Sequence, residues 1–261
     1  MQADINAADQ HSIVLAQLTI NPSFVGNIGT SATPGGYWRI GSTILTVLPV
    51  STAQVGQPTG SGRIKIDQGS TPCTINIGSS AQLATDAGLE PIRLLGSAIA
   101  AINVTAGTVG IATSAPGETA TVTAINATGQ SVVNAGPGVT WTSATSAVAA
   151  GGTANVTLNS GGGTTATTSS GAAMTINGTT AVTTLNVGGT TNWNVRTGGT
   201  DATTANILTG GTLSLALAPA QSTITTVNGY AGGQVLTDPA VPNHLIWTTL
   251  NRVGSGVLQF Q

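Results

Sequence analysis

The chain has 261 residues, enough for one large domain or two ordinary ones. Only 5% of the residues are charged and the net charge is −2, so the chain lacks the basic surface that nucleic-acid binding requires, and we predict no nucleic-acid partner. The hydrophobic residues, 40% of the chain, come in short runs. This pattern excludes a typical disordered chain and any membrane helix of roughly 18 or more apolar residues, so no membrane partner is expected either.

The first third of the chain alternates polar loops with short strand-like runs. We interpret residues 1–12 as an N-terminal arm, because they are polar and lack an apolar period. Each run that follows is bounded by Gly, Pro or Asn, which end strands. The strands expected here lie within 14–20, 37–40, 44–48, 63–67 and 73–78.

One of these runs shows the alternation most clearly. With a period of two, Ile64 and Ile66 are expected to point inward, and Arg63, Lys65 and Asp67 outward. The charged side chains are interpreted as a solvated strand face.

A break in the alternation follows at 79–90, where a surface excursion between coils is expected. Asp86, Glu90 and Arg93 form a charge cluster there, interpreted as a local ion pair that ties down the loop. A cation site is the alternative, although the spacing matches no calcium-binding loop. Residues 91–96 return to the strand pattern, and the units shorten from Ile99 onward.

Paired glycines mark the second half of the chain. Gly-Gly pairs begin at the evenly spaced positions 188, 210 and 232, while a further pair at 198 falls between them. Glycine turns recur more widely near 152, 171, 189, 211 and 233. A repeat of about 20 residues is typical of stacked coils, in which each coil buries its apolar face on the next.

The predicted fold is therefore all-β: a single-stranded parallel β-helix, or β-solenoid, over residues 13–237 with coils of about 18–22 residues. Alternate Val, Ile, Leu and Ala would fill a narrow interior, and Val187, Leu208 and Val227 are expected to lie one above another. A β-sandwich is the alternative fold, but it gives no reason for one Gly-Gly motif to recur at near-equal intervals.

The last segment, 238–261, is interpreted as a C-terminal cap or assembly segment. Pro239 and Pro242 interrupt further strand pairing, and Trp247 is expected to cover the last rung. The apolar tail at 250–261 is either part of the cap or a surface that meets another subunit.

A search for chemistry assigns no catalytic, cofactor-binding or metal-ligating residue. His11, His244 and Cys73 lie far apart in the sequence, whereas a metal site needs clustered ligands. Cys73 is interpreted as a small core residue, with a reactive thiol as the lesser alternative. The eight acidic residues are scattered, so we predict no enzyme and no cofactor, and keep polysaccharide cleavage by a carboxylate pair as an alternative.

Two tryptophans are candidates for carbohydrate binding. Trp141 and Trp193 lie within the repeats, where an exposed indole could stack on a sugar ring. Packing over a coil corner is the favoured interpretation of both. A surface glycan therefore stays a candidate ligand without an assigned residue.

Four segments carry a resemblance to a known group of proteins. Residues 91–97, 104–112, 117–122 and 183–190 resemble poorly characterised phage and prophage virion proteins of the β-solenoid type. The resemblance implies a non-enzymatic structural component of a virion, such as a head decoration, fibre or spike. It also implies contact with capsid or other virion proteins. The low charge of the chain favours association, so we expect a homo-oligomer, either a trimer or a repeating assembly.

The implied location is the virion surface or the extracellular space. Residues 1–9 carry two acids and no secretory signal, so we expect exit on lysis, as for virion parts, or a signal that precedes these residues. The alternatives are a bacterial extracellular fibre or adhesin, and a polysaccharide-binding or polysaccharide-cleaving β-helix.

Overall fold

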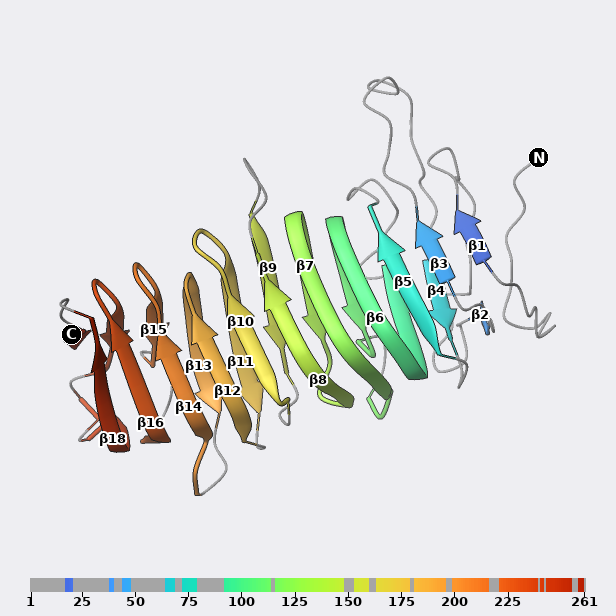
Figure 1. The fold of residues 1–261 in the computed structure, drawn as a ribbon. Helices are drawn as coiled ribbons and strands as arrows, with labels where there is room; N and C mark the ends of the chain where they lie inside the picture. The colour runs from blue at the N-terminus through green and yellow to red at the C-terminus, as the bar shows by residue number, and fades with distance from the viewer. Residues whose placement is uncertain are drawn as a thin grey trace.

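The computed structural model is a rod of stacked β-coils, in which the strands follow one another from the N-terminal to the C-terminal end (Figure 1). The described residues form no helix, and hence none long and apolar enough to cross a membrane. The predicted all-β parallel solenoid is therefore confirmed. The structure describes residues 17–20, 38–39, 44–47, 64–68, 72–78, 92–113, 116–147, 153–159, 163–178, 181–195, 199–215, 221–238, 240–241, 243–254 and 258–260.

The strands fall into two parallel rows, because most strands pair with the strand two places along the chain. The first row contains β1 (Gln17–Ile20), β3 (Ile44–Val47), β5 (Cys73–Ile77), β8 (Val139–Ser146), β10 (Thr165–Thr168), β12 (Val182–Val187), β14 (Ala202–Ile207), β16 (Ser222–Tyr230) and β18 (Leu245–Val253).

The second row lies on the other side of each coil. Two long strands, β6 (Ile92–Ile111) and β7 (Ala120–Ala135), bend around the coil and contribute to both rows. The remaining members of the second row are β2 (Trp38–Arg39), β4 (Ile64–Asp67), β9 (Ala154–Leu158), β11 (Ala173–Gly178), β13 (Thr190–Val195), β15 (Thr212–Ser214), β17 (Gln234–Leu236) and β19 (Gln259–Phe260).

Coil length is nearly constant over most of the rod. Equivalent asparagines on successive coils are 23 residues apart at Asn103 and Asn126, and 20, 22 and 23 apart along the C-terminal coils. Asn76 and Asn103 are 27 apart, so the coils before Asn103 are longer. This agrees with the predicted repeat and with the predicted shortening near Ile99.

The interior is a column of small and medium apolar side chains, which alternate with outward polar ones along each strand. Ile75, Ile102 and Ile125 stack in register and are fully buried, and Leu185 continues the same column further along. Cys73 is buried in this core as a free thiol, as predicted.

Some of the expectations for the loops and termini concern residues that the structure does not describe. Ile66 is buried as expected, whereas Arg63 lies outside the described residues. The same is true of the N-terminal arm at 1–12, of the excursion at 79–90, and of Pro239 and Pro242.

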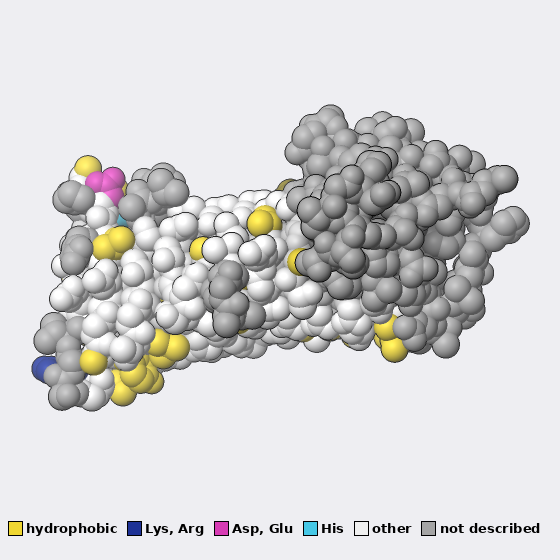
Figure 2. Space-filling model, turned by 90° about the horizontal axis from the view of Figure 1, so that it is seen from above, with side chains coloured by type: hydrophobic (Ala, Val, Ile, Leu, Met, Phe, Trp, Pro, Cys, Tyr) yellow, Lys and Arg dark blue, Asp and Glu magenta, His cyan; other side chains and the backbone are white. Residues whose placement is uncertain are grey.

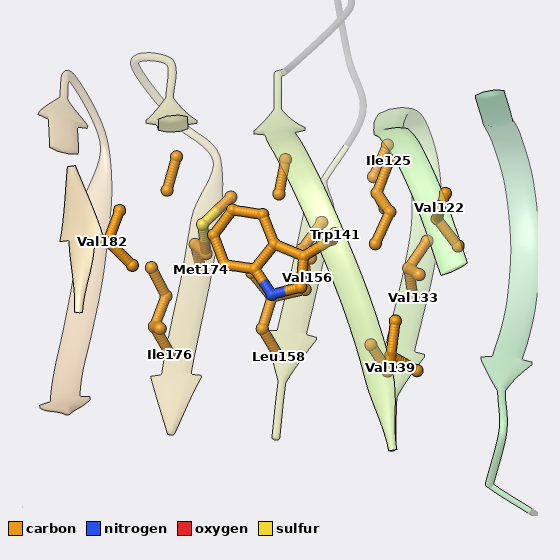
Figure 3. Packing of buried hydrophobic residues seen from close by; sticks show 14 of the residues in the cluster. Val122, Ile125, Val133, Val139, Trp141, Val156, Leu158, Met174, Ile176 and Val182 are labelled. Carbon is orange, nitrogen blue, oxygen red and sulfur yellow. The ribbon is translucent and has the colours of Figure 1, made fainter. Parts of the chain in front are cut away.

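A glycine makes room for the largest core side chain. Trp141 fills the bore between Val156, Leu158 and Met174 (Figure 3). A Cβ atom at Gly163, on the neighbouring coil, would lie 1.7 Å from Cζ3 of Trp141. The two positions are therefore matched, since the indole occupies the space that a side chain at 163 would need.

The paired glycines lie at coil corners, and the two members have different tasks. Gly210 and Gly232 have φ of +73° and +72°, within turns closed by Gly211 N–H to Leu208 O and by Gly233 N–H to Tyr230 O. The second glycine lies against the previous coil: a Cβ at Gly211 would be 1.9 Å from the Val187 carbonyl oxygen.

The predicted column of Val187, Leu208 and Val227 is wrong in its register. Val187 stacks on Ile207, whereas Val227 stacks on Ala205, which stacks on Leu185. Gly189 and Gly211 are stacked on each other. Gly189 comes two residues after Val187, whereas Gly211 comes four residues after Ile207, the residue that stacks on Val187. The second corner is therefore two residues longer. The glycine spacing therefore predicts which corner residues stack, but it does not predict which strand residues stack.

Candidate functional site

The most regular surface of the rod is the outward side of the first row. Its strands carry the motif Thr-Thr-x-Asn, or a close variant, at the same place in each coil. The register aligns the second threonine of every copy into one straight column. The copies are 164–167, 183–186, 203–206, 225–228 and 248–251.

The asparagines of this motif form a hydrogen-bonded ladder. The Nδ2 group of Asn206 donates to Oδ1 of Asn186 at 2.8 Å, and Nδ2 of Asn228 donates to Oδ1 of Asn206 at 2.8 Å. Asn251 continues the ladder at 2.9 Å to Asn228, and Asn186 begins this stretch by donating to Oγ1 of Thr167 at 3.2 Å. Each amide donates toward the N-terminal end of the rod, and Asn186, Asn206 and Asn228 each accept from the C-terminal side.

A second stretch of ladder lies nearer the N-terminal end. Asn126 donates to Asn103 and Asn103 donates to Asn76, both at 2.9 Å. The direction of donation is the same as in the C-terminal stretch. The ladders therefore give the first row a uniform polarity along the rod.

A rank of threonines flanks the ladder. The first threonine of each motif lies at a corner of the coil and is exposed in all but one copy, Thr225 being half-buried. In the view of Figure 2, which labels no residue, charged side chains of described residues are visible only near the C-terminal end of the rod. We use the name Thr/Asn face for the outward side of β8, β10, β12, β14, β16 and β18 together with these first threonines of the motif.

The outward side of the second row is less regular. One of its columns contains Thr157, Thr175, Asn192, Ser214 and Leu236 in turn. A short ladder joins Asn159, Asn177 and Asn194, at 2.9 and 2.8 Å, but it stops there among the described residues. The regularity of the Thr/Asn face is thus not a property of every face of the coil.

The buried polar groups near the C-terminal end support backbone corners. His244 is buried and its Nδ1 accepts a 2.8 Å hydrogen bond from the Asp238 backbone N–H. Asp201 is also buried, and its Oδ2 accepts from the Thr223 N–H at 2.8 Å. Each side chain accepts a hydrogen bond from a backbone N–H near the end of a strand, in place of a backbone carbonyl. Both residues therefore have a structural role.

The residues considered for chemistry are not brought together. Within the described part of the chain, no three His, Cys, Asp or Glu side chains are grouped so that they could hold a metal ion. His11, Asp86 and Glu90 lie outside the described residues. Arg93 lies within β6 and is only 2% exposed.

The hypothesis that two tryptophans stack on sugar rings is wrong. Trp141 is 2% exposed and Trp193 is fully buried, so neither indole offers a face to a ligand. Both lie at inward positions of their strands, where the alternation directs them into the core. The favoured interpretation, packing over a coil corner, is right that both indoles are packed but wrong about the place, because both lie at inward positions within strands.

Trp247, which was expected to cover the last rung, lies within β18 itself. Its ring stacks on Phe260 with centroids 5.3 Å apart and planes 24° apart, joining the two rows across the end of the bore. The indole is still 38% exposed.

The Thr-Thr-x-Asn motif was the signal that sequence reasoning missed. Its copies begin at positions 164, 183, 203, 225 and 248, at intervals of 19 to 23 residues, and the second and fourth residues of each copy lie within a first-row strand. No protein family, curated protein or solved structure matches the chain.

Proposed function

We propose that the chain is a non-enzymatic structural rod of a virion surface, as a fibre, spike or head decoration. The observation that carries the structural part is the continuous stack: one column of paired residues can be followed strand by strand along the first row from β1 to β18. The virion part rests on the sequence resemblance of residues 91–97, 104–112, 117–122 and 183–190.

Stiffness follows from how each coil is held. Backbone hydrogen bonds, the shared apolar interior and the asparagine ladders all link a coil to its neighbours above and below. Bending the rod would open all three on one side at once. Such a stack also offers a protease few free strand edges along its length.

The location can be tested by imaging native assemblies. We expect antibodies raised against the purified chain to label phage particles induced from cells that carry its gene, at the capsid or the tail. Cells lacking the gene provide the labelling control. Label on cell-surface filaments in the absence of particles would support a bacterial fibre or adhesin, and cleavage of a polysaccharide by the purified chain would contradict the structural proposal.

A second candidate function is binding of a regular, uncharged lattice by the Thr/Asn face, for which we name ice. Successive coils are about 4.7–4.9 Å apart. Water oxygens joined by tetrahedral hydrogen bonds of about 2.75 Å have second neighbours about 4.5 Å apart. The coil spacing and the water spacing thus differ by about 0.3 Å per coil. This difference is small enough for threonines on several neighbouring coils to contact lattice positions at the same time.

The ladder favours this candidate because it holds the asparagine amides in one orientation before any ligand binds. Ice growth in the presence of the purified chain tests it. We expect Thr204→Tyr, on the Thr/Asn face, to abolish inhibition of ice recrystallisation, and Thr175→Tyr, on the second row, to leave it unchanged. A wild-type chain without effect on ice would exclude this candidate and leave the structural proposal standing.

A further inference from the structure

The Thr/Asn face repeats in two directions. Along the rod, the second threonine and the asparagine of the motif each form a column, as the stacking of Thr204 on Thr184 and of Asn206 on Asn186 shows. Successive members of a column are about 4.7–4.9 Å apart. Across the rod, the two columns are separated by two residues of extended strand, which is about 6.6–6.8 Å. Because β14, β16 and β18 lie side by side in similar directions (Figure 1), the two repeats form an approximately rectangular net.

The side chains of this net match water in charge and in hydrogen-bonding capacity. The five motif copies contain no charged residue. The ladder uses one of the two N–H groups of the Asn206 amide and one bond to its oxygen, so this rung retains a donor and a lone pair. Among the described residues, none forms a hydrogen bond with the hydroxyl group of Thr184, Thr204 or Thr226. The net therefore offers neutral donors and acceptors at regular positions.

Two repeats of ordinary ice resemble the two repeats of the net. Tetrahedral bonds of about 2.75 Å place oxygens about 4.5 Å apart in rows, and the puckered layers repeat about every 7.3 Å along the hexagonal axis. A prism face of ice, which is parallel to this axis, presents both repeats as a rectangle. The basal face presents the same rows in a rectangle of about 4.5 by 7.8 Å. The separation of the threonine and asparagine columns is thus closer to the prism repeat, by about 0.5 Å.

We propose that the Thr/Asn face binds the prism face of ice, with the rod lying along the rows of oxygens that are about 4.5 Å apart. The threonine column and the asparagine ladder would each follow one row of the same orientation, one layer repeat apart. This inference rests on ice binding, the second candidate function, and adds to it the crystal face and the orientation of the rod.

The length of the motif array suits this match. The five copies, 164–167, 183–186, 203–206, 225–228 and 248–251, span four coil intervals. A difference of about 0.3 Å per coil accumulates to about 1.2 Å over these intervals. This offset is smaller than half of the 4.5 Å row repeat, which is about 2.2 Å. All five copies can therefore contact the same row of the lattice without losing their register.

Other occupants fit this face less well. Five coils present a strip of about 24 by 10 Å, or about 240 Å², whereas a standard protein interface covers about 800 Å² on each partner. A sugar chain would stack on exposed aromatic rings, but Trp141 and Trp193, the tryptophans within the repeats, are buried. A regular neutral lattice is the occupant that the spacing and the charge favour.

The crystal face can be identified by growing a single ice crystal in a dilute solution of the full chain labelled with a fluorescent dye. An amine-reactive dye attaches to Lys65, the only lysine, and to the N-terminus, and Lys65 belongs to the second row. We expect fluorescence on the prism faces and none on the basal face. Labelled Thr204→Tyr is the control and should leave every face dark.

The outcomes separate this inference from the candidate on which it rests. Fluorescence on the basal face alone, or equally on all faces, would overturn the choice of the prism face and leave ice binding standing. A wild-type chain that labels no face would remove both.

A longer net tests the register independently. Ala124 and Ser143 precede Thr165 in the threonine column, so Ala124→Thr combined with Ser143→Thr extends that column by two coils. The accumulated offset becomes about 1.8 Å, still below half of the row repeat. The concentration needed to inhibit ice recrystallisation should fall about twofold or more, because more side chains contact the lattice together.

The matched control is Ala173→Thr, which adds the same groups on the second row and should not change the inhibition. Circular dichroism of each variant establishes that the coils are intact. If the extended variant is folded and inhibits no better than the wild-type chain, the threonine column is not aligned with the lattice and the inference fails.

Discussion

Replacing one asparagine in the middle of the ladder should destabilise the rod measurably. Asn206 donates to Asn186 and accepts from Asn228, both at 2.8 Å, so Asn206→Ala removes two hydrogen bonds and leaves an acceptor and a donor without their partner. A net contribution of about 0.5–1.5 kcal/mol per bond predicts a loss of about 1–3 kcal/mol. All three side chains are half-buried, so water can replace part of each bond and the lower half of that range is expected.

Thermal unfolding followed by circular dichroism measures this loss. A shift of about 2–4 °C per kcal/mol is expected for a chain of this size. Thr203→Ala, an exposed change on the same coil, is the control and should shift the midpoint very little. Equal midpoints for Asn206→Ala and Thr203→Ala would refute the role given to the ladder.

The direction of donation can be tested at the same position with Asn206→Asp. A carboxylate would meet Oδ1 of Asn186, which is itself an acceptor, so the folded chain favours the protonated acid and raises the pKa of the new carboxyl group. The variant is then least stable relative to wild type at neutral pH, and its deficit shrinks as the pH falls through the raised pKa. A deficit independent of pH would contradict this reasoning.

Further predictions concern the corners and the core. Gly211→Ala should lower the unfolding midpoint, because the added Cβ would lie 1.9 Å from a backbone oxygen, whereas Gly199→Ala, with nothing within 4 Å, should be neutral; the two midpoints measured side by side decide this. Trp141→Ala should cost about 3–5 kcal/mol in chemical denaturation, and a loss below about 1 kcal/mol would show that the bore collapses around the cavity. Cys73 should react with a thiol reagent only as the chain opens, so rapid labelling of the native chain would place it at the surface.

The alternation of apolar and polar residues is enough to predict the fold class. Short runs such as Cys73–Ile77 carry a period of two, and their glycine corners recur about every 20 residues, a combination that only a stack of coils explains. The burial of Cys73 and Ile66 follows from the same pattern.

The exact stacking could not be predicted from the glycines, because corners absorb insertions. Gly189, Gly211 and Gly233 do stack, but the turn before Gly189 is two residues shorter than the turn before Gly211. Residues at equal distances from the glycines of these two coils therefore do not stack on each other. The Thr-Thr-x-Asn motif would have given the strand register directly, since its spacing is measured between hydrogen-bonded strands.

The position of the tryptophans could be predicted only in part. Trp141 and Trp193 lie at inward positions of alternating runs, which favours burial, but the space for Trp141 depends on Gly163, which belongs to the next coil. The 43% exposure of Leu250, which follows the buried Val227 in its column, likewise depends on the register of β16 and β18, which composition alone does not give.

The uniform ladder also has an evolutionary consequence. Because every rung offers the same donor and acceptor to its neighbours, removing residues 187–206 would bring Asn228 directly onto Asn186 with an equivalent bond. Whole coils can thus be gained or lost while the chemistry at the new junction is preserved. Rod length becomes a trait that lineages can adjust in unit steps, and homologues of different length are expected to differ by complete coils.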